Sequence, residues 1–327
     1  MAANEFDVIS RFFTGLGPRQ PGTRLAGGDD CALLQLPADH QLCVTTDTLV
    51  AGVHFFTDTA PEDIAWKSLA VNLSDLAAMG AKPAWIQLAL TLPEIDEQWL
   101  TRFSQEFARK LRLHDCQLTG GDITRGPLSV TITAMGQVRE GRALTRSGAQ
   151  VGDLVVVTGT LGEAAAGLKY ANARTRTNDR MNLVKRLLRP EPRVAFAERI
   201  VGLATSAVDI SDGLLADLGH ILAASKVGAE LDIEQLPLSP SLIICEGTDE
   251  ARTLALSGGD DYELCFTLPP RYREEVESLA RKLEVPVTCI GFIQEEQKLV
   301  CRLYRNLYVP QAFGYQHFAE SGTKLGN

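Results

Sequence analysis

Five short segments rich in aspartate and in glycine or hydroxyl residues constrain this chain more than any other feature. They are residues 27–30, 45–47, 120–122, 209–212 and 258–261. Each lies next to an apolar run, and loops at the ends of such elements are where functional side chains are held on a rigid support. So many carboxylates cannot gather without cations, because neighbouring like charges raise one another's pKa. The pattern therefore predicts a site for several Mg²⁺ ions together with a polyphosphate.

The length and charge of the chain limit the remaining possibilities. A length of 327 residues favours two domains, since single cores seldom grow beyond about 250–300 residues. Acidic residues outnumber basic ones, 41 to 32, and the net charge is −9. This charge argues against nonspecific binding to nucleic acid or to an anionic membrane. No apolar run approaches the roughly 20 residues of a membrane span, and the N-terminus lacks the apolar core of a signal peptide.

The seven cysteines are scattered singly, without a C-x-x-C pair or a zinc-binding spacing. Cys43, Cys265 and Cys301 lie in apolar runs, where we expect them to be core residues. Unpaired, buried cysteines are typical of a reducing compartment, so the sequence predicts a cytoplasmic protein.

Residues 41–56 carry the densest group of candidate ligands. The apolar residues 42–44 predict the end of a buried strand, and Thr45, Thr46 and Asp47 follow directly. Two hydroxyls and a carboxylate are hard oxygen ligands of the kind that hold Mg²⁺ beside a phosphate. A strand that leaves the core through a polar turn is the alternative.

A long helix is predicted from Pro61 to Gly80, with proline in its first turn and glycine after its last. Asn72 and Asp75 interrupt its apolar pattern three residues apart, so they share one face. A carboxylate on a largely buried helix must be paired or metal-bound. A structural salt bridge is the alternative to a metal ligand for Asp75.

Two further glycine–acid segments lie in the first half of the chain. Asp30 follows Gly27 and Gly28, and a surface turn is the alternative to a metal loop there. A short strand is predicted over residues 116–118, and it ends in the segment 119–122, which contains Asp122. Other elements predicted here are a short helix at 5–13, strands at 84–92 and 128–138, and a surface helix at 94–112.

The second half begins after a small, polar stretch at 147–153, where we place the domain boundary. A strand at 154–158 leads into a glycine turn and a helix, but the glycine spacing does not fit the dinucleotide pattern G-x-G-x-x-G. Ser211 or Asp212 is predicted to cap a helix that runs toward Ala224. A cap accounts for one acidic residue of the segment 209–212 but leaves the presence of Asp209 unexplained. Strands are also predicted at 264–268, 285–292 and 299–304, and a helix at 274–283.

Several common catalytic signatures are absent from the sequence. It has no Walker A segment, no HRD or DFG segment of protein kinases, no H-E-x-x-H, no EF-hand loop and no G-x-S-x-G elbow. These absences argue against a P-loop NTPase, a protein kinase, an H-E-x-x-H metalloprotease, an EF-hand protein and a hydrolase with a G-x-S-x-G elbow.

Eight segments occur in a fixed order across nearly the full chain: GGDD followed by CALL, VTTDTLVAGVHF, NLSDLAAMGAKP, TGGDITRG, LTRSGAQVGD, VTGTLG, DISDGL and SGGDDYEL. Any one of them is weak evidence, but their joint order is specific. In this order the chain closely resembles the thiamine-monophosphate kinase family. That family belongs to a superfamily of ATP-dependent enzymes with aminoimidazole ribonucleotide synthetase and selenophosphate synthetase.

The resemblance implies an α/β chain of the α+β type with two domains. Residues 1–148 would form an N-terminal ATP- and Mg²⁺-binding domain whose sheet meets that of a partner subunit. Residues 149–327 would form a C-terminal α/β domain that closes the active-site cleft. The protein would be a cytoplasmic homodimer that binds ATP, several Mg²⁺ ions and thiamine monophosphate, with no nucleic-acid or membrane partner.

The resemblance also implies roles for individual residues. The implied metal ligands are Asp30, Thr45, Thr46, Asp47, Asp75, Asp122, Asp209 and Asp212. The implied nucleotide contacts are Gly121, Asp122, Arg146 and Ser211, and the implied thiamine phosphate contacts are His54, Asp260 and Tyr315. Two positions depart from the family pattern, which usually has Glu in place of Asp260 and often Trp in place of Tyr315.

The implied reaction is phosphorylation of thiamine monophosphate to thiamine diphosphate by direct in-line transfer. The acceptor phosphate has a second pKa of about 6, so it is largely dianionic near pH 7 and needs no general base. We therefore expect no catalytic base and no covalent nucleophile. One alternative is another ATP-dependent enzyme of the superfamily, but a selenophosphate synthetase would carry a reactive Cys ahead of its glycine-rich loop, and no Cys precedes Cys31. A non-catalytic acidic cation-binding protein is the other alternative.

Overall fold

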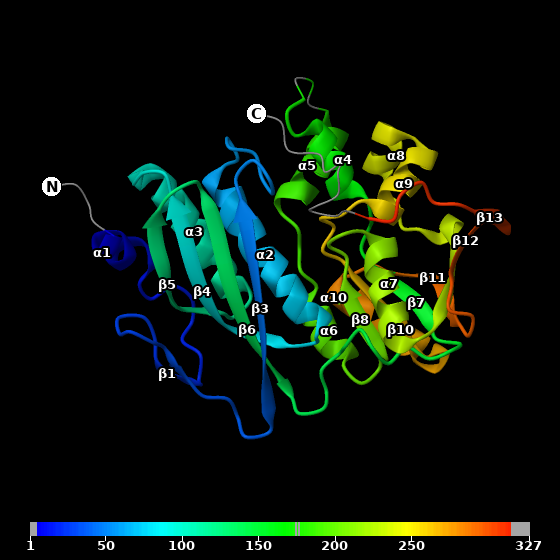
Figure 1. The fold of residues 1–327 in the computed structure, drawn as a ribbon, viewed down its shortest axis with the longest axis horizontal. Helices are drawn as coiled ribbons and strands as arrows, with labels where there is room; N and C mark the ends of the chain where they lie inside the picture. The colour runs from blue at the N-terminus through cyan, green and yellow to red at the C-terminus, as the bar shows by residue number, and fades with distance from the viewer. Residues whose placement is uncertain (1–4, 174, 176, 315–327) are drawn as a thin grey trace. The chain divides into compact units, whose positions relative to one another are not determined.

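The computed structural model describes residues 5–173, 175 and 177–314, and the chain divides into two compact units (Figure 1). Unit 1 contains the described residues up to 76 together with 81–141, and unit 2 contains 77–80 and the described residues from 142 onward. The predicted N-terminal helix is present as α1 (Glu5–Val8) and a following π-helical turn, η1 (Ile9–Phe13). Both units combine helices and strands, as the predicted fold class requires.

Unit 1 is built on a four-stranded sheet in the order β3-β6-β4-β5. Strands β4 and β5 run parallel, whereas β6 is antiparallel to both of its neighbours. A two-stranded ribbon of β1 and β2 precedes this sheet in the chain. The strands are β1 (Thr23–Leu25), β2 (Leu33–Leu34), β3 (His40–Val50), β4 (Lys82–Leu92), β5 (Gln117–Arg125) and β6 (Ser129–Arg139).

Two long helices, α2 (Pro61–Ala78) and α3 (Glu97–Leu113), cover one face of this sheet (Figure 1). The surface helix predicted at 94–112 is confirmed as α3, in which Phe103 and Phe107 are fully buried with their ring centroids 5.8 Å apart. Asp96 caps α3 by accepting the backbone N–H groups of Gln98 and Trp99. The buried apolar face of each helix supplies most of its stability, since helices of this length are marginal alone.

The predicted strand end at residues 42–44 is wrong in two respects. β3 lies at the edge of the sheet and continues through Thr45, Thr46 and Asp47 to Val50. Leu42 and Val44 are 45% and 57% exposed rather than buried. Threonine is β-branched and suits a strand as well as valine does, so a polar sequence does not end the strand here.

The short strand predicted at 116–118 also continues, as β5, through Thr119, Gly120 and Gly121 to Arg125. The pairing with β4 shifts by one residue at this place, which is a bulge. Gly121 has φ +152°, and a Cβ there would lie 1.8 Å from the carbonyl oxygen of Leu88. The glycine therefore serves close approach of two strands and not a turn.

Unit 2 is built on a seven-stranded sheet in the order β13-β12-β9-β11-β7-β10-β8. Strands β12 and β9 are parallel, and the other neighbours are antiparallel. The strands predicted at 154–158 and 264–268 are confirmed with the same bounds. The strands are β7 (Leu154–Thr158), β8 (Ser206–Asp209), β9 (Gly228–Asp232), β10 (Leu264–Leu268), β11 (Val287–Gln294), β12 (Leu299–Leu303) and β13 (Asn306–Tyr308).

Helices pack on both faces of the unit 2 sheet. On one face, α7 (Leu214–Ser225) joins an apolar core with Val155 and Val157 of β7. On the other face, Phe196 of α6 (Val194–Ile200) packs against Phe266 of β10, with ring centroids 5.9 Å apart. Adjacent residues of a strand point to opposite faces, which is why the runs in β7 and β10 are apolar throughout.

A second apolar cluster in unit 2 joins four helices around Ala166, Leu183, Leu242 and Ala251. These helices are α4 (Glu163–Tyr170), α5 (Asn178–Leu188), α8 (Pro240–Glu246) and α9 (Thr248–Ser257). The break between α5 and α6 falls at residues 189–193, where two prolines cannot continue a helix. The remaining elements are α10 (Arg273–Leu283) and the short turns η2 (Ile233–Gln235) and η3 (Pro270–Tyr272).

All seven cysteines are free thiols. Cys265 and Cys301 are buried as expected, whereas Cys43 is only half-buried and Cys31 is exposed. Within the described part of the chain, no helix is long and apolar enough to cross a bilayer.

Candidate functional site

Unit 1 brings two of the predicted metal ligands into contact across the interface between β3 and α2. Asp75 accepts a 2.5 Å hydrogen bond from the hydroxyl of Thr45, and the backbone N–H of Asp47 donates to Asn72 at 3.1 Å. Burial, together with the charge and hydrogen bond of Asp75, raises the pKa of Asp47 to about 6. Two carboxylates that oppose each other's ionisation in this way attract a cation.

The side chain of Thr46 does not join this pair. Its hydroxyl lies on the other face of β3, 2.9 Å from the hydroxyl of Thr133 on β6, because successive residues of a strand alternate between faces. The next residue on that face, Thr48, pairs with Thr131 in the same way. The position of this side chain does not support the predicted role of Thr46 as a metal ligand.

Asp30 and Asp122 are both exposed and belong to neighbouring segments of unit 1. The loop that carries Asp30 runs beside β5, since a Cβ on Gly27 would lie 3.7 Å from the carbonyl oxygen of Thr119. Asp122 lies on β5 itself, opposite Ala89 of β4. The structure thus places the two glycine–acid segments of unit 1 next to each other.

His54 follows a tight turn after β3. Its Nδ1 accepts the backbone N–H of Val50 at 3.0 Å, so the proton of the neutral ring lies on Nε2. The backbone oxygen of His54 accepts from Lys67 at 3.4 Å. The ring is therefore held at a fixed angle, with a hydrogen-bond donor on its far side.

The donor set of unit 1 fits Mg²⁺. Among the described residues, no three His, Cys, Asp or Glu side chains converge closely enough to hold a metal ion. Mg²⁺ does not need such a cage, because it is usually bound by one or two carboxylates, waters and the phosphates of a substrate. Asp47 and Asp75, with the Thr45 hydroxyl beside them, match that description.

Unit 2 brings the two acidic segments of the second half together. Residues 209–212 lie alongside 260–263, because the N–H of Ile210 donates to the oxygen of Glu263 and the N–H of Asp260 donates to the oxygen of Ser211, both at 2.8 Å. A Cβ on Gly259 would lie 2.4 Å from the oxygen of Ser211. The contact therefore requires glycine, and it places the predicted residues of both segments side by side.

The predicted cap of α7 is wrong. Neither Ser211 nor Asp212 caps the helix; the N-cap residue is Gly213, which makes no side-chain cap. Instead Asp217, one turn into the helix, reaches back and accepts the N–H groups of Ser211, Asp212 and Gly213 at 3.0, 3.0 and 3.1 Å. Asp217 was not predicted from the sequence, although an acid within the apolar run LLADLGHIL is the same signal that identified Asp75.

Asp260 sits in a strained backbone conformation. Asp260 and Tyr262 have φ +68° and +51°, and left-handed conformations of non-glycine residues cost roughly 1–3 kcal/mol each. The Tyr262 hydroxyl donates to Asp260 Oδ1 at 3.0 Å. Such strain clusters at functional sites, and here it fixes the direction of the Asp260 carboxylate.

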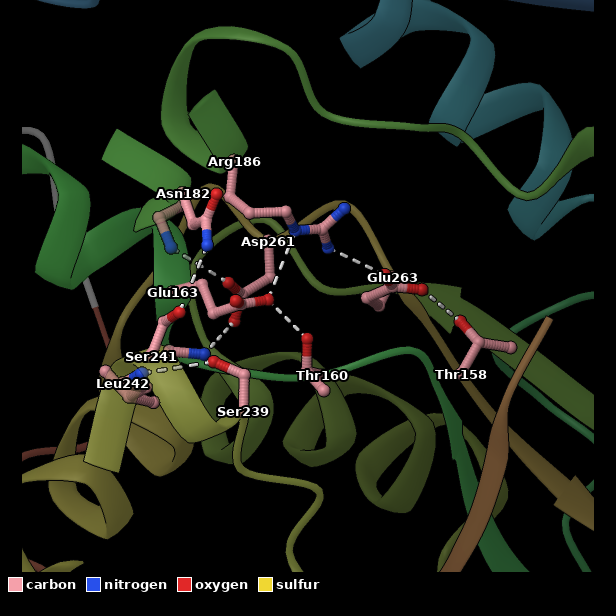
Figure 2. A network of polar contacts seen from close by, with 12 residues as sticks. Thr158, Thr160, Glu163, Asn182, Arg186, Ser239, Ser241, Leu242, Asp261 and Glu263 are labelled. Atoms are coloured by element: carbon pink, nitrogen blue, oxygen red, sulfur yellow. Dashed lines mark hydrogen bonds and ion pairs between the residues drawn. The ribbon is translucent and has the colours of Figure 1, made fainter. Parts of the chain in front are cut away.

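A buried ionic network supports this loop, as Figure 2 shows. The fully buried Glu263 accepts hydrogen bonds from Thr158 at 2.6 Å, Arg186 at 2.8 Å and Arg193. Complete burial opposes ionisation, but Arg193 and Arg186 hold the pKa of Glu263 below its ordinary value. The network was not predicted, because the pairing of these distant residues leaves no local pattern.

Asp261 anchors the start of α4 to the same loop (Figure 2). Its carboxylate accepts the N–H groups of Gly162 at 2.7 Å and Ala164 at 3.4 Å. Burial raises the pKa of Asp261 to about 8, opposed by these hydrogen bonds and by Arg186. The side chain of Glu163 contacts Thr160 and lies 3.3 Å from Arg186, which ties the glycine turn 159–162 to the network.

Of the other predicted residues, Asp209 ends β8 and is buried, opposite Leu264 of β10. Arg146 is exposed, and its carbonyl oxygen accepts from the hydroxyl of Ser225 at 3.3 Å. Tyr315 lies outside the described residues. The structure thus assembles one group of predicted residues in each unit.

A pocket of about 340 Å³ in unit 1 involves none of the predicted residues. It lies between the β1–β2 ribbon and the start of β4, with Trp85 and Arg24 in its wall. Its lining contains no carboxylate. The acidic groups described above therefore remain the candidate site.

Two family models match the sequence. The N-terminal domain of AIR synthase related proteins matches residues 28–138, and the C-terminal domain matches residues 150–303. Thiamine-monophosphate kinase of Escherichia coli K12 is 49% identical over 323 residues, which cover 98% of this chain and 99% of that protein.

Solved structures agree with the sequence matches. Thiamine-monophosphate kinase from Stenotrophomonas maltophilia K279a superposes with a TM-score of 0.83 at 50% identity, covering 88% of this chain and 93% of the other. The structure of AaThiL complexed with AMPPCP and TMP superposes with a TM-score of 0.75 at 31% identity, covering 87% and 89%. The chain belongs to the thiamine-monophosphate kinase family of the AIR synthase related proteins.

Proposed function

We propose that this protein transfers the γ-phosphoryl group of ATP to thiamine monophosphate, giving thiamine diphosphate and ADP. The observation that carries the proposal is the 49% identity to a thiamine-monophosphate kinase over nearly the whole of both chains. A related structure at 31% identity is complexed with AMPPCP and TMP, that is, with an ATP analogue and the acceptor. A cytoplasmic location accords with ATP as a substrate and with the free thiols.

Asp47 and Asp75 would hold Mg²⁺ with Thr45, and Asp30 and Asp122 are proposed as further ligands from unit 1. Bound Mg²⁺ would neutralise charge on the phosphates of ATP. Burial and the charge of Asp75 raise the pKa of Asp47, and this supports the assignment, since a bound cation would stabilise the ionised form of both carboxylates. Thr46 is not retained as a side-chain ligand, because its hydroxyl lies on the other face of β3. In unit 2, Asp209 and Asp212 are proposed as ligands, and Gly121 of unit 1 and Ser211 of unit 2 are proposed to contact the nucleotide.

Arg146 and His54 are proposed to bind the phosphates of the two substrates. Arg146 would bind the nucleotide, since a guanidinium pairs with phosphate oxygens through two hydrogen bonds. The Nε2–H of His54, fixed by the hydrogen bond of Nδ1 to Val50, would donate to the acceptor phosphate. Both contacts lower the repulsion between two polyanions, which is the main barrier to this reaction.

Asp260 would recognise the thiazolium cation of the acceptor. Its direction is set by Tyr262 and by the backbone contact to Ser211, so the carboxylate is presented in one orientation. Tyr315 is proposed as an aromatic partner of the same cation. The aspartate found here reaches less far than the glutamate usual in the family, so the acceptor would sit closer to this loop.

No residue is proposed as a general base or as a covalent nucleophile. The acceptor phosphate is already largely dianionic near pH 7, so positioning and charge stabilisation suffice. Transfer would be in line, with ATP chiral at the γ-phosphorus giving inverted configuration. Net retention, or an enzyme labelled by ATP without acceptor, would exclude direct transfer.

The proposed reaction is tested with purified protein, ATP, Mg²⁺ and thiamine monophosphate, by separating thiamine mono- and diphosphate and quantifying ADP. Equal amounts of ADP and thiamine diphosphate are expected. ATP consumption that depends on selenide or on another acceptor, and not on thiamine monophosphate, would support a different enzyme of the superfamily. Binding of Mg²⁺ without any turnover would support a cation-binding protein.

We also propose a homodimer formed through the open face of the unit 1 sheet. The exposed Leu42 and Val44 on edge strand β3 support this assignment, since apolar residues on an open sheet face favour association. Sedimentation should give twice the chain mass, and Val44→Lys should shift the protein toward monomer. Monomeric wild-type protein would contradict the proposal.

A further inference from the structure

We propose that Asp217 is a positioning residue that fixes the turn 211–213 for binding of the Mg²⁺–nucleotide complex. The inference rests on the proposed function, because Ser211 and Asp212 are the residues whose placement it explains. Asp217 was not among the residues that the sequence suggested. Its hydrogen bonds go to backbone N–H groups. Its negative charge also lies close enough to Asp212 for the two carboxylates to repel each other.

The geometry of the contact is specific. A single oxygen, Oδ2 of Asp217, accepts three successive N–H groups within 3.1 Å, those of Ser211, Asp212 and Gly213. The side chain comes from the first turn of α7 and is only 2% exposed. Three consecutive N–H groups that point to one atom form a concave anion-binding turn, and a carboxylate oxygen is the acceptor that this turn favours.

The turn is held from its other side as well. The oxygen of Ser211 accepts the N–H of Asp260 at 2.8 Å, and a Cβ on Gly213 would lie 2.8 Å from the backbone of Ser257. Segment 211–213 therefore has its N–H groups bound to Asp217 and its first carbonyl bound to the neighbouring loop. The side chains of Ser211 and Asp212, both half-buried, remain to meet a ligand.

A shift of the turn would displace the Asp212 carboxylate and the Ser211 hydroxyl together. Residues that orient metal ligands typically change metal affinity or activity by about 10- to 100-fold when they are replaced. Loss of the Asp217 carboxylate would also leave three N–H groups to find other partners, which weakens the turn. We therefore expect binding of the Mg²⁺–nucleotide complex to depend on this residue.

Asp153 offers a matched control in the same unit. It is also buried, at 4% exposure, and its carboxylate accepts the backbone N–H of Gln150 at 2.9 Å and the hydroxyl of Thr205 at 2.6 Å. It stabilises a turn that carries none of the proposed ligands. A purely structural effect of removing a buried turn-binding carboxylate should appear equally at both positions.

The test compares wild-type protein with Asp217→Asn, Asp217→Ala, Asp153→Asn and Asp153→Ala. Calorimetry measures the affinity for Mg²⁺ with a nonhydrolysable ATP analogue, and hydrogen exchange follows the amides of 211–213. We expect affinity to fall about 10- to 100-fold in Asp217→Ala, with faster exchange at the three amides. The asparagine oxygen still accepts hydrogen bonds, so Asp217→Asn should show a smaller loss of both. The Asp153 variants should lose thermal stability without a comparable loss of affinity.

Turnover of the wild-type protein separates this inference from the proposed function. If the wild-type protein does not phosphorylate thiamine monophosphate, the proposed function fails, and the binding and exchange measurements still decide the role of Asp217. Unchanged nucleotide affinity in folded Asp217→Asn and Asp217→Ala would overturn the inference. An equal loss of affinity in the Asp153 variants would overturn it as well.

Discussion

Arg193 binds both carboxylate oxygens of Glu263, with Nε 2.6 Å from Oε2 and Nη2 2.5 Å from Oε1, although Glu263 is completely buried. Removing one partner of such a pair leaves an uncompensated buried charge, which typically costs about 3–5 kcal/mol. Arg193→Met should therefore lower the free energy of unfolding by an amount of this order, measured by urea denaturation.

The exposed pair Arg273–Glu277 on α10 is the control for this prediction. Glu277→Gln should change the free energy of unfolding by less than about 1 kcal/mol, because exposed pairs contribute little. Arg193→Met with a loss no larger than that of Glu277→Gln would show that Arg186 and Thr158 alone suffice to hold Glu263.

Asp75→Asn should have opposite effects on stability and on activity. Without Mg²⁺ near pH 7.5, loss of one charge relieves Asp47, whose pKa is raised to about 6, and should stabilise unit 1 by on the order of 1 kcal/mol. The asparagine oxygen can still accept from Thr45, so the fold is retained. Turnover should fall by about 100-fold, with weaker activation by Mg²⁺.

The control is Asp58→Asn, which removes a carboxylate from an exposed loop of unit 1 and should change neither stability nor turnover. Asparagine at Asp30, Asp122 or Asp212 should also remove most turnover. Together with Asp75→Asn these make four variants, and near-wild-type activity at saturating Mg²⁺ in three of the four would refute the proposed Mg²⁺ ligands.

His114, at the end of α3, should make the protein sensitive to acid. Burial and the charge of Lys110 lower the pKa of His114 from 6.5 to about 4. Between these two pH values the unfolded chain binds a proton that the folded chain does not, so stability falls as pH is lowered from about 6.5 toward 4 and is unaffected above it. His114→Gln should flatten this part of the stability profile.

Denaturation midpoints at several pH values between 4.5 and 7.5 measure this effect. His220→Gln, at an exposed position of α7, controls for the loss of a histidine. A profile of His114→Gln as steep as that of the wild-type protein would assign the acid sensitivity to other groups.

Arg146→Ala should raise the apparent KM for ATP or lower kcat, by about 10-fold, because a charge-assisted contact to phosphate contributes roughly 1.5–3 kcal/mol. The residue is exposed, so its removal should leave the unfolding midpoint unchanged. Arg139→Ala, at the exposed end of β6, is the control for loss of a surface charge. ATP kinetics equal to those of the wild-type protein would count decisively against the contact.

Asp260→Ala should impair the use of thiamine monophosphate far more than that of ATP, because the carboxylate is proposed to meet the acceptor cation. Tyr262→Phe removes the hydrogen bond to Oδ1 of Asp260 and should raise the KM for the acceptor to a smaller extent. Asp260→Glu restores the residue usual in the family and should retain specificity. Equal losses for both substrates in Asp260→Ala would indicate that the residue only maintains the strained loop.

Local pattern predicted most of the elements of this chain. Helices α2 and α3 and strands β7 and β10 follow from apolar periodicity and from their terminal residues. The pattern failed at β3 and β5, where threonine and glycine were expected to end a strand. In β3 the edge position allows polar residues inside the strand, and in β5 the glycine permits close contact with Leu88. Both reasons are tertiary and leave no trace in the neighbouring sequence.

The candidate site could likewise be predicted only in part. Asp75 could be identified because it interrupts an apolar helix, and Asp217 could have been found in that way. The contact of Asp47 with Asp75 and the alignment of 209–212 with 260–263 depend on which elements become neighbours, which a single sequence does not specify. The buried partners of Glu263 also come from distant segments and therefore could not be predicted.

The network around Glu263 also determines when this part of the molecule can form. Thr158 and Glu263 are 105 residues apart in the chain, and Gly162 and Asp261 are 99 residues apart. Strand β10 must insert between β7 and β8 before either contact exists, and closing such long loops slows folding. During synthesis, a chain that has not yet released residues 260–268 leaves Arg186 and Arg193 without their buried carboxylate. Assembly of the loop that carries Asp260 is therefore a late event on the ribosome.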